Sequence, residues 1–317
     1  MKKRLSKILS LSITAALLVP TMASATDMQE TAAPAPAPIQ AVIDQGVTGT
    51  MDNTGQNALA NTPVVPAPPG YDAYRNDIAH GNTNLIFYYS TTVGTTRKAT
   101  VYTPPGYSPN KKYNVLYLLH GIGGDEYEWV NAMKPKNILD NLYSEGKLSQ
   151  MIVVMPNGRA MKDDRPVGDI FAPDKVAAFE RFEQDLLKDL IPHIEANYPV
   201  YKDKNSRALA GLSMGGGQSL NFGLKNLNTF AWVGAFSAAP NTQSVSQLVS
   251  NPGQVASQLK LLWISCGSSD GLLWVSQNFK NGLSSMNIPH TWYLDVGGHE
   301  PSVWNSGLYQ FSQRIFK

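Results

Sequence analysis

The chain has 317 residues, with 26 basic and 24 acidic side chains and a formal net charge of +2. Four basic residues lie within the first seven, and the chain beyond them carries 22 basic against 24 acidic residues. A charge so close to zero gives no reason to expect a nucleic-acid partner or an anionic membrane surface, and a neutral substrate fits better. Cys266 is the only cysteine, so no intramolecular disulfide is possible and the fold must rest on its core.

Residues 1–25 have the features of a secretory signal peptide. A basic start precedes an apolar stretch from about residue 8 to residue 20, and Ala23-Ser24-Ala25 fits the small-residue cleavage pattern. The apolar stretch is too short to span a bilayer. We therefore expect a secreted protein, extracellular or periplasmic, with no membrane attachment once the signal is removed.

Residues 26–70 are rich in Ala, Pro, Thr, Asn and Gln, and include APAPAP and PVVPAPPG. They show no apolar period that could build a core, which predicts a flexible linker. We expect one globular domain over residues 71–317.

Strand-like and helix-like segments alternate through that domain. Residues 85–90 and 98–102 predict an antiparallel pair with a turn near Gly94. Further buried strands are predicted at residues 114–119, 151–155, 207–210, 231–236, 261–265 and 291–294. Apolar residues at helical spacing from Phe179 to Ile194 predict an amphipathic helix, kinked near Pro192. This order predicts the α/β class, with a mostly parallel sheet covered by helices on both faces.

The segment RALAGLSMGGG at residues 207–217 is the most informative motif. Its residues 211–215 match G-x-S-x-G, the strand-to-helix turn that exposes a serine hydroxyl at the edge of an α/β-hydrolase sheet. The serine of such a turn is strained, and a side chain at either flanking glycine would collide with the neighbouring strand or helix. The motif predicts Ser213 as a nucleophile.

Residues 267–271 (GSSDG) also satisfy G-x-S-x-G after a predicted strand, so the bare pattern is weak evidence. Ser269 would leave too little chain after it for separate acid and base loops. Asp270, its immediate neighbour, could not orient a histidine for it. We therefore favour Ser213.

A serine nucleophile needs a histidine base and an acid that orients the base, and in this fold they follow the serine as acid, then histidine. His299 lies in a loop just past the last predicted strand, whereas His290 begins that strand and is better explained as structural. Asp270 follows the preceding strand and is the favoured acid. Asp295 is the alternative, but it lies only four residues before His299.

The negative charge that develops on the substrate needs two backbone N–H groups. Met214, directly after the serine, should supply one, and the loop HGIGG at residues 120–124 should supply the other. His120 precedes the nucleophile and is expected to brace this loop. No metal-ligand pattern stands out and no cofactor is expected.

Two other residue types remain open. Cys266 follows an apolar run and is expected to be a buried, inert thiol. Trp129, Trp274 and Trp304 could stack on a flat ring or a sugar, or could simply pack in the core or on the surface.

Several long motifs, in order, resemble the feruloyl esterase domains of carbohydrate esterase family one, in particular the esterase modules of bacterial xylanases. They are YNVLYLLHGIGG, RALAGLSMGGGQS, SAAPNT, SCGSSD and GGHEPSVWNSGLYQF, and they span about residue 82 to the C-terminus. The resemblance implies an α/β-hydrolase fold, a catalytic Ser213, Asp270 and His299, and oxyanion amides at Ile122 and Met214.

The same resemblance implies a substrate. The family cleaves ferulate and related hydroxycinnamates from arabinose on xylan, so a feruloylated arabinoxylan or xylo-oligosaccharide is the expected partner. Acetyl xylan esterase is one alternative, and a non-catalytic carbohydrate-binding protein on a hydrolase scaffold is another. The chain departs from the family in having Glu300-Pro301 after the histidine, where aspartate is common, and in a charged segment at residues 157–174 that we expect to border the pocket.

Overall fold

The computed structural model describes residues 64–317. The predicted signal peptide and most of the predicted linker lie outside this range. Eight strands form one sheet: β1 (Asn82–Ser90), β2 (Thr95–Thr103), β3 (Asn114–Leu119), β4 (Met151–Pro156), β5 (Arg207–Leu212), β6 (Trp232–Phe236), β7 (Leu261–Gly267) and β8 (Thr291–Asp295). All the predicted strands are present, most of them one to three residues longer than the sequence pattern indicated.

The strand order is β1-β2-β4-β3-β5-β6-β7-β8. Strand β2 pairs antiparallel with both β1 and β4, and all other neighbours are parallel. The mostly parallel α/β-hydrolase sheet with an antiparallel N-terminal pair is therefore confirmed. Since β3 and β5 are neighbours, with Leu119 opposite Gly211, the loop after β3 and the serine turn after β5 leave the sheet side by side.

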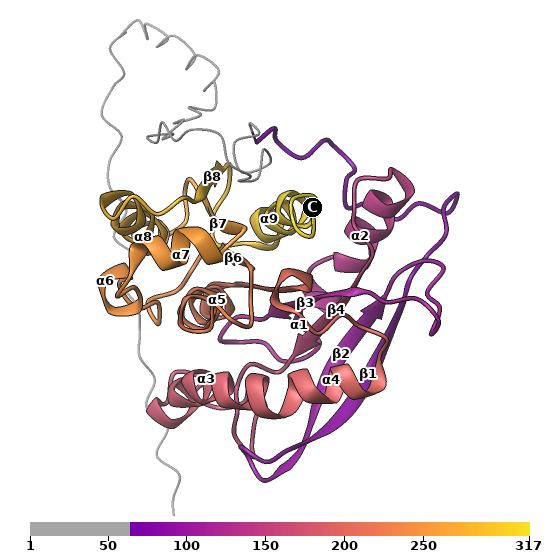
Figure 1. The fold of residues 1–317 in the computed structure, drawn as a ribbon, viewed down its shortest axis with the longest axis horizontal. Helices are drawn as coiled ribbons and strands as arrows, with labels where there is room; N and C mark the ends of the chain where they lie inside the picture. Colours follow the sequence, from indigo (N-terminus) through magenta and orange to yellow (C-terminus); the bar gives the residue numbers. More distant parts are fainter. Residues whose placement is uncertain (1–63) are drawn as a thin grey trace, which may run out of the picture. The chain divides into compact units, whose positions relative to one another are not determined.

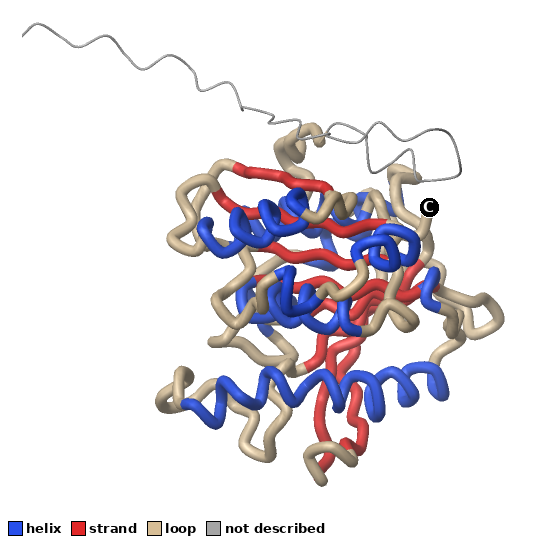
Figure 2. Tube along the Cα trace, turned by 60° about the vertical axis from the view of Figure 1, so that its left-hand side comes forward, coloured by secondary structure: helices blue, strands red, loops and turns tan. Residues whose placement is uncertain are grey.

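Helices cover both faces of the sheet (Figures 1 and 2). The helical segments are α1 (Glu128–Ala132), α2 (Pro135–Ser144), α3 (Pro173–Asp185), η1 (Leu186–Leu190), α4 (Ile191–Asn197), η2 (Lys204–Ser206), α5 (Ser213–Lys225), α6 (Val245–Leu248), α7 (Pro252–Gln258), α8 (Leu273–Ser285) and α9 (Pro301–Ser312). Helices α1, α2 and α9 pack on one face, and α3 to α8 pack on the other. Strand β3 shows the consequence, because Val115 and Tyr117 belong to one apolar cluster and Leu116 and Leu118 to the other.

The predicted helix through Phe179 and Ile194 is continuous but irregular. It runs as α3, then the π-helical η1, then α4, and Pro192 follows just after the π segment. Proline cannot donate to the carbonyl one turn earlier, so a locally widened helix precedes it. The irregularity expected at Pro192 therefore takes this form, centred a few residues earlier.

The last residues of the predicted linker contact the domain. Val64 and Ala67 pack against the α2–α9 side of the core, and the Gln310 side chain donates to the carbonyl of Val65 at 2.6 Å. These residues, which lie inside the segment 26–70 that composition alone marks as linker, therefore pack on the domain.

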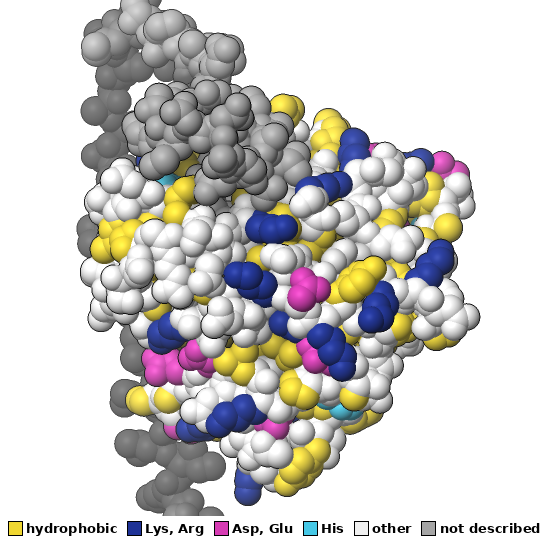
Figure 3. Space-filling model, in the orientation of Figure 1, with side chains coloured by type: hydrophobic (Ala, Val, Ile, Leu, Met, Phe, Trp, Pro, Cys, Tyr) yellow, Lys and Arg dark blue, Asp and Glu magenta, His cyan; other side chains and the backbone are white. Residues whose placement is uncertain are grey.

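Lys and Arg side chains are scattered among acidic and neutral ones on the face shown in Figure 3. No helix among residues 64–317 is both long enough and apolar enough to cross a membrane.

Candidate active site

Ser213 occupies a strained turn between β5 and α5. Its φ of +50° lies in the left-handed region that a non-glycine residue rarely adopts. A Cβ on Gly211 would lie 2.6 Å from the backbone of Gly215, and a Cβ on Gly215 would lie 2.6 Å from the carbonyl oxygen of His120. Both flanking glycines are therefore required by close backbone packing, which holds the serine at the sheet edge.

Three side chains from different loops meet at this serine. The Oγ of Ser213 lies 2.9 Å from Nε2 of His299, and Nδ1 of His299 lies 2.9 Å from Oδ2 of Asp270. Ser213 and His299 are 86 residues apart in the sequence. The structure thus brings together the three side chains predicted as nucleophile, base and acid, and it does so where β5, β7 and β8 end.

The carboxylate of Asp270 is buried and held in its ionised form. Burial by itself would raise its pKa, but hydrogen bonds from the Leu272 amide (2.7 Å) and from His299 outweigh burial and lower the pKa of Asp270 below its usual value. An ionised Asp270 can only accept, so Nδ1 of His299 must donate to it. Nε2 is then free to accept the proton of the Ser213 hydroxyl.

The loops after β7 and β8 are locked together, which fixes His299. The Ser268 and Ser269 amides donate to the carbonyls of Asp295 (2.7 Å) and Gly297 (2.8 Å). The imidazole ring of His299 also packs edge-on against Trp304, with centroids 5.0 Å apart. Backbone pairing sets the position of the histidine, and the indole limits the rotation of its ring.

The rival residues stand outside this arrangement. Ser269 is exposed, and a Cβ on Gly271 in its motif would meet nothing within 4 Å. The Asp295 side chain accepts from the adjacent Val296 amide at 2.8 Å, and His290 pairs through Nδ1 with the Ile288 carbonyl at 2.8 Å. Neither side chain is hydrogen-bonded to Ser213 or His299 in the described structure.

The HGIGG loop is held by two charged residues that the sequence did not single out. Glu128 accepts from the Gly121 amide at 2.7 Å, and Arg159 donates to the carbonyl of Ile122. Within residues 64–317 the amide of Ile122 makes no backbone or side-chain hydrogen bond, and that of Met214 lies in the first turn of α5, where helix amides lack intrahelical partners. Two amides from the predicted segments are thereby available beside Ser213.

His120 braces the loop, as its position before the nucleophile suggested. It is fully buried, and the Gly158 amide donates to its Nε2 at 2.7 Å. Nδ1 must therefore carry the proton and donate to the Gly121 carbonyl at 2.6 Å. Burial lowers the pKa of His120, so the ring stays neutral.

A small apolar cluster surrounds the nucleophile. Its buried members are Phe179, Met214 and Ala239, and Ile122, Val176 and Leu272 pack against them partly exposed. Ala239 lies directly against the serine, since its amide donates to the Ser213 carbonyl at 3.1 Å. The cluster therefore places apolar side chains next to the hydroxyl.

The charged segment after β4 borders this cluster, as expected. Arg159 lies over the Phe179 ring at 5.0 Å, and Ile170 reaches to within 3.9 Å of the Cβ position of Gly123. Arg97 holds the start of this segment in place, because its guanidinium donates to the carbonyls of Asn157 and Arg159, both at 2.8 Å. The position of Arg159 in the sequence could have identified it, because it lies three residues after β4, a strand that pairs with β3.

The remaining candidates have structural positions. Cys266 is buried, as expected, and burial raises the pKa of its thiol to about 11, which disfavours the thiolate form. Trp129 is a core residue whose indole donates to the Leu119 carbonyl, whereas Trp274 is 54% exposed. No cluster of three or more potential metal ligands is present among residues 64–317.

The fold and the serine turn place the chain among known proteins. The esterase family model ("Putative esterase") matches residues 90–306. The chain belongs to this esterase family. It is 32% identical over 285 residues to the endo-1,4-beta-xylanase/feruloyl esterase of Xylanibacter ruminicola, and 33% identical over 162 residues to endo-1,4-beta-xylanase Y of Acetivibrio thermocellus. These alignments cover 87% and 48% of the esterase, but only 37% and 13% of the relatives' lengths.

Solved structures agree with this membership. The esterase resembles the CE1 ferulic acid esterase of Anaeromyces mucronatus in complex with ferulic acid, with a TM-score of 0.72 and 28% identity. That match covers 79% of the esterase and 96% of the fungal chain. The S-formylglutathione hydrolase of Staphylococcus aureus shares the fold at 21% identity and a TM-score of 0.58.

Proposed function

We propose that the esterase is a secreted serine hydrolase that releases ferulate or a related hydroxycinnamate from arabinoxylan. The observation that carries this is the pair of 2.9 Å contacts joining Ser213, His299 and Asp270 at a strained serine turn. A hydroxyl, a base and an ionised acid in this order are what acyl transfer requires.

The reaction runs through an acyl-enzyme. His299 takes the proton of Ser213 as Oγ bonds to the ester carbonyl carbon, and the Ile122 and Met214 amides stabilise the resulting oxyanion. The carbon–oxygen bond to the alcohol then breaks, and His299 returns its proton to the leaving sugar oxygen. A water molecule, deprotonated by His299, next attacks the acyl carbon and frees the acid and the serine.

The preference for hydroxycinnamates is supported by the relatives and by the apolar cluster. The X. ruminicola relative is named as a feruloyl esterase, and the A. mucronatus structure holds ferulic acid. In this chain, Ile122, Val176 and Leu272 are the partly exposed members of the apolar cluster, and they supply surface on which a planar ring would be shielded from water. The alcohol side would then be the carbohydrate.

Acetyl ester cleavage is the second candidate. An acetyl esterase of Caldicellulosiruptor saccharolyticus is 21% identical over 240 residues. A side-by-side assay decides between the two activities, with methyl ferulate, methyl p-coumarate and acetylated xylan as substrates. Turnover of the hydroxycinnamates supports the proposal. Release of acetate with no activity on methyl ferulate contradicts it. If no substrate is turned over and a serine-directed probe does not label the protein, a non-catalytic binding protein is supported instead.

Secretion is proposed from residues 1–25 alone. Expression of the full chain followed by fractionation and N-terminal sequencing tests it. We expect cleavage after Ala25 and protein outside the cytoplasm, and an intact N-terminus in the cytoplasm would contradict export.

A further inference from the structure

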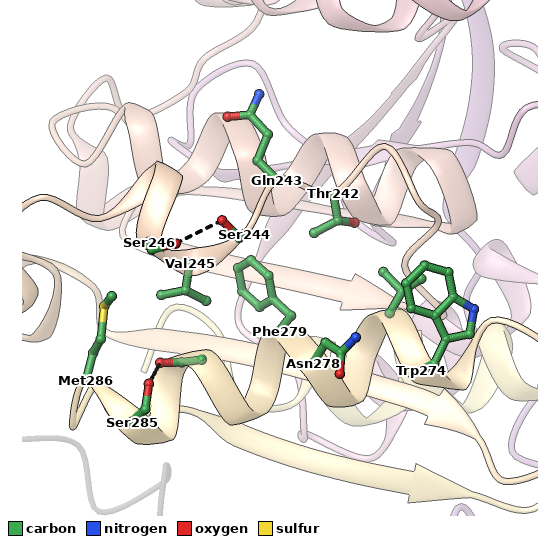
Figure 4. A pocket seen from close by; sticks show the side chains of 12 residues that line it. Thr242, Gln243, Ser244, Val245, Ser246, Trp274, Asn278, Phe279, Ser285 and Met286 are labelled. Atoms are coloured by element: carbon green, nitrogen blue, oxygen red, sulfur yellow. Dashed lines mark hydrogen bonds between the residues drawn. The ribbon is translucent and has the colours of Figure 1, made fainter.

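A groove separates α6 from α8 beside the active site. Its volume is about 350 Å³, within the range of roughly 300–1,000 Å³ typical of small-molecule sites. One wall is formed by α8 side chains, including Trp274, Asn278 and Phe279, and the other by residues 242–246. In Figure 4, Thr242 and Trp274 lie at one end of the groove, and Ser285 and Met286 lie at the other.

Two short backbone connections join the near end of the groove to the catalytic residues. On one wall, the Thr242 amide donates to the Ala239 carbonyl at 3.0 Å, and the Ala239 amide donates to the Ser213 carbonyl at 3.1 Å. On the other wall, α8 begins three residues after Asp270, and the Leu273 amide donates to the Asp270 carbonyl at 3.0 Å. One end of the groove therefore lies close to Ser213 and Asp270.

The lining of the groove is neutral and mixed in character. None of its twelve residues is acidic or basic. Val245 and Phe279 are buried, whereas Trp274 is 54% exposed. The side-chain amides of Gln243 and Asn278 make no hydrogen bond to other described residues, so they can serve a ligand.

This chemistry selects the kind of ligand. A charged group would find no counter-charge in the groove and would lose hydration without compensation. A sugar ring presents a flat carbon–hydrogen face, which fits an exposed indole, and hydroxyls, which pair with side-chain amides and hydroxyls. Helix α8 rises about 18 Å from Trp274 to Met286, long enough for more than one ring.

We propose that the groove between α6 and α8 is a subsite for the carbohydrate portion of the ester substrate. It would hold neutral pentose units beyond the ester oxygen, with Trp274 stacking on the first of them. This inference rests on the proposed function of the Ser213 site. It assigns the apolar cluster to the acyl group and the groove to the leaving group.

The kinetic test compares two substrates of the same acyl group. Trp274→Ala should raise the ratio of KM for a feruloylated arabino-xylo-oligosaccharide to KM for methyl ferulate roughly tenfold. Tyr89→Ala is the matched control, because Tyr89 is an aromatic residue of similar exposure (64% against 54% for Trp274) on β1, remote in sequence from both walls. An unchanged ratio, or an equal rise in both KM values, would overturn the subsite.

A binding test separates this inference from the proposed function. Unesterified xylo-oligosaccharide and arabino-xylo-oligosaccharide are titrated into the Ser213→Ala variant by calorimetry, with and without Trp274→Ala. Binding that Trp274→Ala weakens supports the subsite even if no ester is hydrolysed. Absence of binding at millimolar sugar overturns the subsite even if methyl ferulate is turned over.

Discussion

The two G-x-S-x-G turns of this esterase share a pattern but not a geometry. At Ser213 the serine has φ +50° and both glycines are enclosed by neighbouring backbone. At Ser269 the serine is exposed and Gly271 faces open space, and only Gly267 is enclosed, since a Cβ there would collide with the Gly297 carbonyl oxygen. The comparison teaches that the pattern indicates a nucleophile only where both of its glycines are enclosed and the serine has a positive φ.

Removing each serine hydroxyl in turn is the strongest test of this difference. Ser213→Ala should lower kcat on methyl ferulate by about 10⁴-fold or more, because the nucleophile is lost. Ser269→Ala should change kcat less than about twofold, since only an exposed hydroxyl is removed. Initial rates across a substrate series measure both, and comparable losses in the two variants would contradict the assignment.

The acid is tested by a matched pair of carboxylates. Asp270→Asn should lower kcat by about 10³- to 10⁴-fold, because the amide can no longer hold His299 in the required tautomer. Asp295→Asn should retain most of the activity, since the Asp295 side chain accepts from the neighbouring Val296 amide and is not hydrogen-bonded to His299. If the two effects were reversed, Asp295 at the end of β8 would have to be assigned as the acid in place of Asp270.

The glycines sharpen the comparison through stability. Gly215→Ala places a Cβ 2.6 Å from the His120 carbonyl and should lower the free energy of unfolding by about 2–4 kcal/mol. Gly271→Ala meets open space and should stay within about 0.5 kcal/mol. Urea unfolding measures both changes, and equal tolerance at the two sites would show that the Ser213 turn is not tightly enclosed.

The smallest expected effect concerns pH. The pKa of Asp270 is lower in the folded protein than in the unfolded chain, so its ionised form stabilises the fold above the unfolded pKa of about 4. That contribution is lost as pH falls through the folded pKa. The stability difference between the native protein and Asp270→Asn should therefore shrink as the pH falls below about 4, and a difference that grows on acidification would contradict the lowered pKa.

Much of the fold could be predicted because apolar runs separated by turn residues report buried strands directly. The positions of β3 and β5, and the order serine, acid, histidine, follow from local patterns that the fold translates into one sheet edge. The contacts of Val64 and the π-helical segment before Pro192 could not be predicted. They depend on which distant surface the chain meets.

The same limit applies to the site. Ser213, Asp270 and His299 each follow a strand, which made them predictable, whereas Glu128 and Arg159 act through long side chains on a loop that is not their own. Likewise, the sequence does not distinguish the roles of Trp129, Trp274 and Trp304. Packing alone separates them into a core residue, a groove rim and a support for the His299 ring.

The central claim is that Ser213 is the activated nucleophile. Its most direct test is labelling of the esterase with a fluorophosphonate, followed by proteolysis and mass spectrometry of the peptides. The geometry predicts a single adduct, on the peptide that contains Ser213. The Asp270→Asn variant should form this adduct much more slowly or not at all. An adduct on the Ser269 peptide, or none on a folded protein, would contradict it.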